Sequence, residues 1–325
     1  MKSSCEKNAS SLIAVLAFYK FSKLDAIDEL QISLLDFCRQ RGIKGTILLA
    51  PEGINGTVAG EQRVIEELIA KFDSIEGLPG MERKISFAGE PPFHRLKVKI
   101  KKEIVTMGVP GIDVARRTGV HLDAKEWNQL IENEDVLVLD TRNQYEIDIG
   151  TFKNARSPGT ETFREFPGFV EQALASDKRQ KIAMFCTGGI RCEKASAYLL
   201  EQGFDEVYQL NGGILRYLEE VEPEDNLWRG ECFVFDSRVS VDARLDPGTF
   251  KQCFACRHPL SEEQLKSSKY REGVSCPMCF DSLDEKKRAS VEERQKQVAL
   301  AEARNQQHIG AEMPGSRGTN KNGSG

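Results

Sequence analysis

The chain has 325 residues, of which 40% are hydrophobic, and it carries a formal net charge of −5 at pH 7. Domains usually have roughly 100–200 residues, so this length predicts two or three domains with packed cores. No apolar run approaches the ~20 residues of a membrane-spanning helix, so no membrane association is expected. The net charge does not by itself indicate a nucleic-acid-binding protein.

The nine cysteines are an odd number, and four of them form two close CxxC pairs. This usage suits a reducing compartment better than a disulfide framework, so a cytoplasmic protein is expected. The short apolar stretch at 12–18 lacks a small-residue cleavage site. We interpret it as a strand and not as a signal peptide.

Residues 1–107 are predicted to form a ferredoxin-like domain. The expected elements are a strand at 12–19, a helix at 24–41, strands at 44–50 and 57–59, a helix at 61–72 and a strand at 93–105. Helical spacing of apolar residues distinguishes the two helices from the strands. The order β-α-β-β-α-β is typical of one antiparallel sheet backed by two helices.

The last of these strands is basic along one face. Its apolar residues alternate with four cations, which are Arg95, Lys97, Lys99 and Lys101. Cations at intervals of roughly 7 Å can follow the phosphate backbone of a nucleic acid. Lysines on an edge strand also protect a sheet from aggregation, so both interpretations stay open.

Residues 108–122 are interpreted as a linker and residues 123–222 as a parallel α/β domain. The expected elements are a helix at 123–133, capped by Asp123 and Glu126, and strands at 136–139, 182–185 and 206–210. In such sheets function lies at the carboxyl ends of the strands. Asp140, Arg142 and Cys186 follow strand ends and are expected to meet at one site.

Cys186 lies between a strand end and the start of a helix. The loop after it contains Thr187, Gly188, Gly189, Ile190 and Arg191. Glycines allow several backbone N–H groups to point at one atom, and the helix dipole and the arginine add positive charge. These effects favour a thiolate, so Cys186 and Arg191 are the candidate catalytic residues.

The Cys-x4-Arg spacing resembles the loop of rhodanese domains, in which the cysteine carries a persulfide sulfur. The alternative is a structural cysteine in an ordinary strand-to-helix turn. Asp140 is expected mainly to brace neighbouring loops and not to do chemistry. Cys192 either resolves an oxidised or persulfidated Cys186 as a disulfide or points into the core.

Residues 223–283 are predicted to form a small zinc module. Cys253, Cys256, Cys276 and Cys279 have the spacing C-x2-C-x19-C-x2-C. Two such pairs complete a closed, structural tetrahedral Zn²⁺ site, whereas free thiols or a redox CxxC are the alternatives. Residues 284–309 are expected to form a charged, solvated helix, and residues 310–325 a disordered tail.

Four segments in the same order resemble the tRNA uridine hydroxylase family, whose members join a ferredoxin-like domain to a rhodanese domain. They are Ala50–Thr57, Gly150–Phe152, Thr160–Pro167 and Cys186–Lys194. The resemblance extends from about Leu12 to Cys279. It implies oxygen-dependent conversion of the wobble uridine of tRNA to 5-hydroxyuridine, with a persulfide-forming cysteine at Cys186 and O2 as co-substrate.

The residues alone do not predict a hydroxylation reaction. No flavin, haem or nicotinamide site is visible in the sequence, and the four histidines do not suggest an iron site. Three hypotheses therefore remain. The first is a tRNA hydroxylase that binds tRNA through the basic strand and the zinc module. The second is a sulfurtransferase, and the third is a non-enzymatic RNA-binding protein. For the second hypothesis a sulfur-donor protein is a candidate partner.

Overall fold

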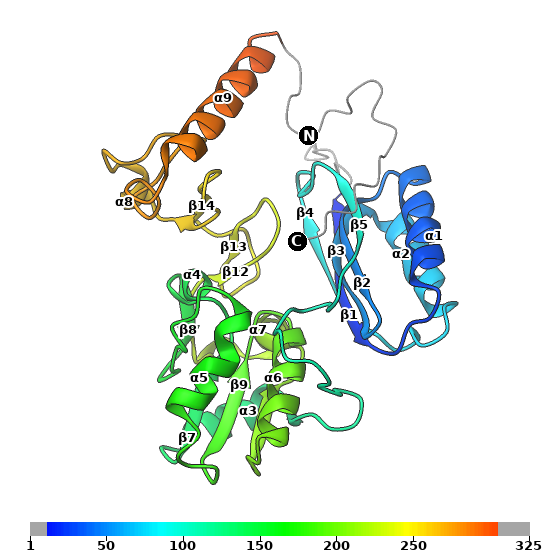
Figure 1. The fold of residues 1–325 in the computed structure, drawn as a ribbon, viewed down its shortest axis with the longest axis vertical. Helices are drawn as coiled ribbons and strands as arrows, with labels where there is room; N and C mark the ends of the chain where they lie inside the picture. The colour runs from blue at the N-terminus through cyan, green and yellow to red at the C-terminus, as the bar shows by residue number, and fades with distance from the viewer. Residues whose placement is uncertain (1–11, 305–325) are drawn as a thin grey trace, which may run out of the picture. The chain divides into compact units, whose positions relative to one another are not determined.

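The computed structural model describes residues 12–304, which divide into two compact units between Lys251 and Gln252. Figure 1 shows the elements of both units. Within residues 12–304 no helix is long and apolar enough to cross a membrane. The first unit contains two domains, which are described in turn.

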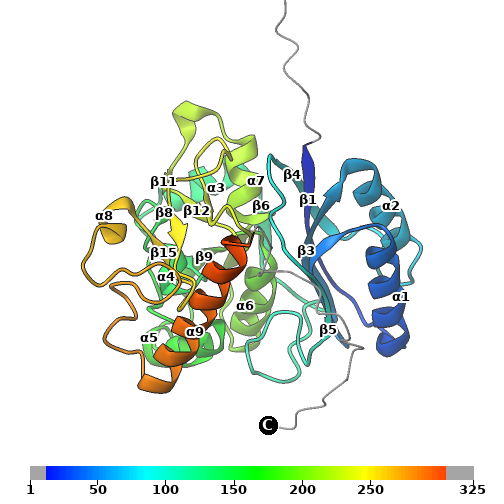
Figure 2. The same ribbon diagram turned by 90° about the horizontal axis from the view of Figure 1, so that it is seen from above.

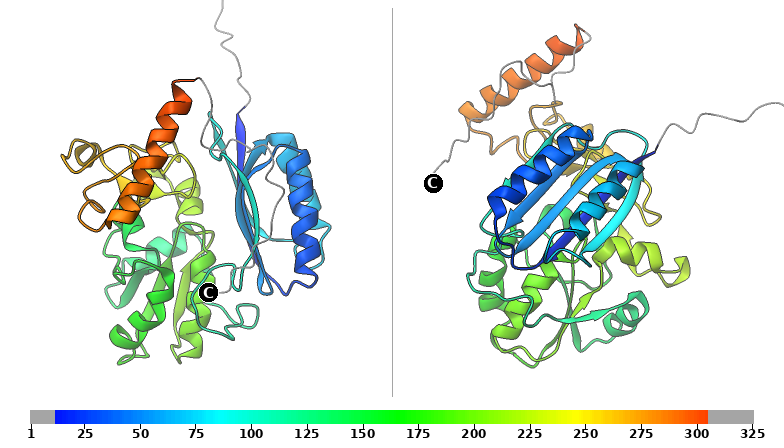
Figure 3. Two further views of the ribbon diagram at one scale, coloured as in Figure 1. Left: turned by 45° about the horizontal axis from the view of Figure 1, so that its top comes forward. Right: turned by 90° about the vertical axis from the view of Figure 1, so that its right-hand side faces the viewer.

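The N-terminal domain has a five-stranded sheet in the order β4-β1-β3-β2-β5. Its elements are β1 (Ile13–Phe21), α1 (Ile27–Gln40), β2 (Lys44–Ala50), β3 (Gly53–Glu61), α2 (Gln62–Asp73), β4 (Glu82–Ala88) and β5 (Leu96–Ile100). The first four strands pair antiparallel, and α1 and α2 lie along one face (Figure 3). The predicted ferredoxin-like domain is confirmed.

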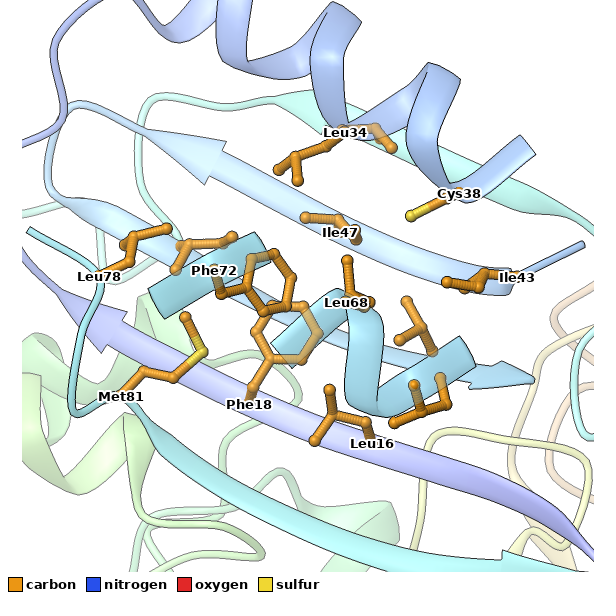
Figure 4. Packing of buried hydrophobic residues seen from close by; sticks show 14 of the residues in the cluster. Leu16, Phe18, Leu34, Cys38, Ile43, Ile47, Leu68, Phe72, Leu78 and Met81 are labelled. Carbon is orange, nitrogen blue, oxygen red and sulfur yellow. The ribbon is translucent and has the colours of Figure 1, made fainter. Parts of the chain in front are cut away.

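Strand alternation gives this sheet two different faces. In β1, Ala14, Leu16 and Phe18 are buried against the two helices, together with Leu34 and Leu68 (Figure 4). Because side chains alternate along a strand, the residues between them face the other side of the sheet. That second face carries no helix of its own domain and forms part of the site described below.

The apolar pattern of the sequence did not predict β4, and it predicted too long a strand after it. The fourth ferredoxin-like strand is β4, whose Ile85 and Phe87 are 41% and 48% exposed. It lies at a sheet edge among charged residues, so its apolar pattern is weak. The strand predicted at 93–105 is only Leu96–Ile100, a fifth strand that pairs parallel to β2 at the opposite edge.

The second domain has a parallel four-stranded sheet in the order β6-β10-β9-β7. Its elements are β6 (Val120–Leu122), α3 (Ala124–Ile131), β7 (Val136–Asp140), α4 (Gln144–Ile147), β8 (Gly150–Phe152), the 3-10 turn Phe163–Glu165, α5 (Phe166–Ala173), β9 (Lys181–Phe185), α6 (Ile190–Glu201), β10 (Val207–Leu210) and α7 (Gly213–Glu220). The capping box of Asp123 and Glu126 is present at α3. The last three residues of the predicted linker form an edge strand of this sheet.

Residues 223–251 belong to the first unit and not, as predicted, to the cysteine-rich module. They contain a 3-10 turn (Pro223–Asp225), β11 (Trp228–Gly230), β12 (Cys232–Phe233) and β13 (Ser240–Val241). Strand β11 pairs with β8, and Trp228 and Cys232 are buried in the same core as Trp127. The reason is packing, because these apolar side chains complete the core of the parallel α/β domain.

The second unit holds three short elements and one long helix around a small core. They are β14 (Lys251–Gln252), which begins at the boundary, β15 (Pro259–Leu260), α8 (Glu262–Leu265) and α9 (Glu285–Glu302). The buried residues of its core cluster are three cysteines (Cys253, Cys276 and Cys279) with Leu260 and Leu283, and Cys256 is partly buried beside them. Helix α9 begins at the cap residue Asp284 and has charged residues on all sides, as predicted. The predicted helix end at 305–309 and the tail at 310–325 lie outside the described residues.

Candidate active site

The loop after β9 holds the buried thiol of Cys186, which is 1% exposed. Gly189 precedes α6 and has a φ of 93°, a conformation that residues with a Cβ rarely adopt. This backbone turn lets the Gly189 N–H donate a hydrogen bond of 3.1 Å to Cys186 Sγ. Gly189 therefore stabilises the sulfur atom directly through this hydrogen bond.

The surroundings of Cys186 favour its anion. Burial by itself would raise the pKa of the thiol, but the Cys192 thiol, the Arg191 cation and the backbone N–H groups of both residues lower that pKa to about 6. At neutral pH the sulfur is therefore largely thiolate, as the loop sequence predicted. A thiolate is the nucleophilic form of cysteine.

Arg191 is not a free cation, because its guanidinium pairs with Glu146. Two hydrogen bonds of 2.6 and 2.8 Å join Arg191 Nη1 and Nη2 to the carboxylate oxygens, and the Glu146 side chain is fully buried. Burial opposes ionisation of this carboxyl, but Arg191 keeps the pKa of Glu146 below its usual range. No pattern in the sequence predicted Glu146, because it is 45 residues from Arg191 and belongs to no motif.

Cys192 lies in the first turn of α6, fully buried beside Cys186. Burial and the neighbouring Cys186 sulfur raise the pKa of its thiol far above the ordinary value. Its Sγ lies 3.5 Å from Thr141 Oγ1. Cys192 is therefore a protonated S–H donor to the Cys186 thiolate, and it is both in the core and next to the reactive sulfur.

Asp140 and Arg142 form a fully buried ion pair with a distance of 2.7 Å. Arg142 also donates to the carbonyl groups of Glu146 and Gly150, and Asp140 accepts from the Thr151 hydroxyl. The pair thus fixes the loops on either side of α4, including the one that positions Glu146. This is the bracing role that the sequence analysis expected for Asp140.

A cavity of about 860 Å³ separates the cysteine loop from the helix-free face of the N-terminal sheet. Cys186, Thr187, Gly188, Ile190 and Arg191 line one side of it. The opposite side consists of residues from β1, β2, β3 and β4. Figure 2 shows this sheet with α1 and α2 on one side and α6 and α7 on the other.

The residues that follow Cys192 hold the two domains together. Lys194, whose side chain is 2% exposed, contacts Glu52 and Glu103 at 2.8 and 2.7 Å. Glu193 accepts hydrogen bonds from the hydroxyl of Tyr19 at 3.3 Å and from His121 at 2.8 Å. The helix that begins at the reactive loop is therefore anchored to the N-terminal domain.

Tyr19 brings the N-terminal domain close to the sulfur loop. A Cβ placed on Gly189 would lie 2.9 Å from the Tyr19 hydroxyl oxygen. Burial, followed by the nearby Glu193 carboxylate, raises the pKa of Tyr19, so the hydroxyl stays protonated. Neither Tyr19 nor the cavity was predicted, because their positions depend on contacts between domains.

The four predicted zinc ligands come together in the second unit. The sulfur atoms of Cys253, Cys256, Cys276 and Cys279 all lie within 4.8 Å of one another. Two of the separations, Cys256–Cys276 and Cys276–Cys279, are 3.6 and 3.7 Å. Four thiolates around Zn²⁺ at about 2.3 Å would be about 3.8 Å apart, so the cluster fits a structural zinc ion.

The basic strand has the predicted exposure but lies away from the cavity lining. Arg95, Lys97, Lys99 and Lys101 are all exposed on or beside β5. Because β5 is an edge strand, the protective role is compatible with its position. The geometry leaves both interpretations of these cations open.

Comparison with known proteins agrees with this architecture. Residues 13–104 match the UPF0176 acylphosphatase-like domain, and residues 123–220 match the rhodanese-like domain. The fold and the cysteine loop therefore define a rhodanese-domain protein. The chain has the domain architecture of the UPF0176 family, as the resemblance implied.

Solved structures similar to part of the chain include the rhodanese-like domain of the Alr3790 protein from Anabaena sp., with 21% identity, coverage of 34% of this chain and 78% of that one, and a TM-score of 0.28. A rhodanese-related protein from Thermoplasma volcanium has 23% identity, coverage of 32% and 95%, and a TM-score of 0.26. At these TM-scores the similarities support no conclusion about function.

Proposed function

We propose that this protein hydroxylates the wobble uridine of tRNA to 5-hydroxyuridine, with O2 as co-substrate and Cys186 as the catalytic cysteine. One observation carries the proposal. The activated sulfur opens into a cavity of about 860 Å³ that the rhodanese domain shares with the UPF0176 domain. Such a volume accommodates a nucleoside, since small-molecule sites usually have roughly 300–1,000 Å³.

In this proposal the chain's own residues hold a sulfur anion against the bound base. The Gly189 N–H and the Arg191 cation stabilise negative charge on the sulfur, whether it is a thiolate or a persulfide. The domain contacts made by Glu193 and Lys194 hold the N-terminal sheet opposite the cysteine loop. Transfer of one oxygen atom to C5 and reduction of the other to water consume two electrons, so an electron donor besides O2 takes part.

The exposed cations of the β5 edge are the proposed tRNA-binding surface. Replacing Lys97 and Lys99 by glutamate is expected to abolish tRNA modification, because these cations would contact the phosphate backbone of the RNA. Sulfur transfer from thiosulfate to cyanide should be kept, because these small substrates do not need the phosphate-binding surface. Replacing Lys178 and Arg179, two cations of the rhodanese domain, is the matched control. Persistent modification in the Lys97 and Lys99 variant would remove β5 from the proposal.

The deciding experiment is mass spectrometry of tRNA nucleosides from cells that lack the protein. The cells are complemented with wild type, Cys186→Ala, or Cys38→Ala as a control for a buried cysteine outside the site. We expect 5-hydroxyuridine and its derivatives to disappear in the deletion and to return with wild type and Cys38→Ala only. Unchanged 5-hydroxyuridine in the deletion strain would refute the proposal.

A second candidate function is sulfur transfer through Cys186, with a sulfur-donor protein as partner. The donors around Cys186 Sγ and the match to the rhodanese-like domain favour it. It predicts loss of a thiolated nucleoside, or of another sulfur product, in the same deletion cells. Intact 5-hydroxyuridine together with such a loss would select this function over hydroxylation.

A further inference from the structure

We propose that the helix-free face of the N-terminal sheet reads the imide edge of a uracil base, with Asn55 as the acceptor and Thr46 and Thr57 as the donors. The substrate class rests on the proposed function. The assignment of the reading residues rests on the geometry of the sheet, which lines the same cavity as Cys186.

The three side chains share one face by strand register. Thr46 in β2 lies directly opposite Thr57 in β3, and Asn55 comes two residues before Thr57 on the same strand. Directly opposed side chains have Cβ atoms about 5 Å apart, and residues i and i+2 lie roughly 7 Å apart. The intervening residues, such as Ile47, are buried among the helices on the other face. The polar triplet therefore points into the cavity.

The orientation of the Asn55 amide is fixed by its neighbour. Its Nδ2 donates a hydrogen bond of 2.9 Å to the carbonyl oxygen of Ile104. A carbonyl accepts and does not donate, so the nitrogen must face it. The Oδ1 atom has no hydrogen-bond partner within residues 12–304, although it lines the cavity. Asn55 thus presents a fixed, unused acceptor.

The two threonine hydroxyls are also unused. Neither Thr46 Oγ1 nor Thr57 Oγ1 has a hydrogen-bond partner in the described part of the chain, and both side chains are half-buried. The charged residues of the cavity differ, because Arg83, Arg216 and Arg238 each face an acidic partner. The free polar groups at this wall are neutral, which suits a base better than a phosphate.

A uracil ring matches this set of groups. Its N3–H is a donor and would meet Asn55 Oδ1, whereas the carbonyl oxygen on one side of N3 would accept from the two threonine hydroxyls, which lie together on one side of Asn55. Cytosine has an acceptor at N3 and would place two acceptors against each other. Apolar side chains of the cavity, including Leu48, Leu215 and Ile190, can cover the ring faces. Reading the N3 edge leaves the C5–C6 edge of the ring free to face the cysteine loop.

The test measures binding under anaerobic conditions with wild-type protein. Three anticodon stem-loop RNAs carry uridine, cytidine or 3-methyluridine at the wobble position, and binding is followed by fluorescence polarisation. We expect uridine to bind about tenfold more tightly than the other two, because each leaves a buried acceptor unpaired. Since 3-methyluridine changes only the ligand, this comparison does not depend on how a variant folds.

Variants then assign the preference to residues. Asn55→Leu is expected to bind all three RNAs equally, because it removes the acceptor for N3–H. Thr57→Val should weaken the binding of uridine and 3-methyluridine alike, and Thr106→Val, outside the cavity lining, should keep the tenfold preference. The assignment is overturned if wild-type protein binds the three RNAs equally or binds none of them. It is also overturned if the preference for uridine survives in Asn55→Leu.

The nucleoside measurement separates this inference from the proposed function. If deletion cells lose 5-hydroxyuridine but wild-type protein binds the three RNAs equally, the proposed hydroxylase function is supported and the proposed uracil-reading role of the sheet is refuted. If the preference for uridine depends on Asn55 but deletion cells keep 5-hydroxyuridine, the uracil-binding site is supported and the proposed hydroxylation is refuted.

Discussion

The protein uses cysteine in two contrasting ways. In the rhodanese domain, a single thiolate at Cys186 lies in a preformed loop among N–H donors, a paired arginine and a large apolar core. In the second unit, the sulfur atoms of four cysteines lie within 4.8 Å of one another, and three of these cysteines are buried with two leucines in a very small core. One region is folded by packing and holds a reactive sulfur, whereas the other brings four sulfur atoms together in an arrangement that can hold a metal ion.

The difference lies in what stabilises each sulfur. The Cys186 anion is held by fixed donors of the protein, so it stays available for chemistry. Four clustered thiolates repel one another unless a cation joins them, and their bonds to that cation then supply folding energy. The same residue type is therefore reactive in a rigid domain and structural in a small one.

Metal removal is expected to have the largest effect and to act on the second unit alone. Chelation, or Cys276→Ser, should unfold the region around residues 252–283, since structural Zn²⁺ supplies roughly 10–16 kcal/mol to small domains. Elemental analysis should find one zinc per wild-type chain, and hydrogen exchange should report the unfolding.

The two tryptophans of the chain provide the internal control for this experiment. Trp127 and Trp228 both lie in the rhodanese core, so their fluorescence should not change when zinc is removed. The contrast would fail if Cys276→Ser kept one zinc per chain, or if the tryptophan signal changed with chelation.

Breaking the buried ion pair behind the reactive loop is expected to be the next largest effect. Glu146→Gln leaves the Arg191 cation without its carboxylate and should lower the free energy of unfolding by about 3–5 kcal/mol. The denaturation midpoint followed by tryptophan fluorescence measures this loss.

The same substitution at an exposed ion pair is the matched control. Glu206 pairs with Lys181 at side-chain exposures near 44%, so Glu206→Gln should cost less than about 1 kcal/mol. Equal losses in the two variants would show that the Arg191 pair does not support the loop.

The pH dependence of alkylation tests the reactive cysteine itself. A thiolate reacts and a thiol does not, so lowering the pKa of Cys186 to about 6 keeps its rate near maximal down to about pH 7. At pH 6.5 its thiolate fraction should exceed that of an ordinary cysteine on the order of 50- to 100-fold. Peptide mapping after iodoacetamide treatment separates Cys186 from the other cysteines.

The shape of this profile is the deciding feature, because burial slows the absolute rate at every pH. A Cys186 rate that still rises steeply between pH 7 and pH 9 would remove the claim of an activated thiolate. Cys38, whose pKa burial raises to about 12, should show no alkylation over the same range.

The smallest predicted effect concerns Cys192. Replacing it by alanine removes an S–H donor to the Cys186 thiolate, so the midpoint of the alkylation profile should move to higher pH by roughly one unit. A profile that is unchanged or shifted downward would mean that Cys192 does not stabilise the anion. Thr141→Val, which touches Cys192 but donates nothing to Cys186, should shift the profile less.

Local signals in the sequence predicted both cysteine regions. The Cys-x4-Arg loop with its two glycines and the pair of CxxC motifs each place their groups within a few residues of one another, so the spacing alone limits the geometry. Periodicity likewise identified α1, α2, α3 and the central strands, because those elements bury one continuous apolar face. It failed for β4, whose position at a sheet edge leaves Ile85 and Phe87 exposed.

The sequence by itself thus determined the reactive thiol, the metal-binding cluster and the order of the domains. Only the tertiary structure decided the partner of Arg191, the junction around Glu193 and Lys194, and the cavity that joins Cys186 to Asn55. Tyr19 and Glu193 are separated by 174 positions along the chain. Such contacts leave no periodic or motif signal, since they exist only after two folded surfaces meet.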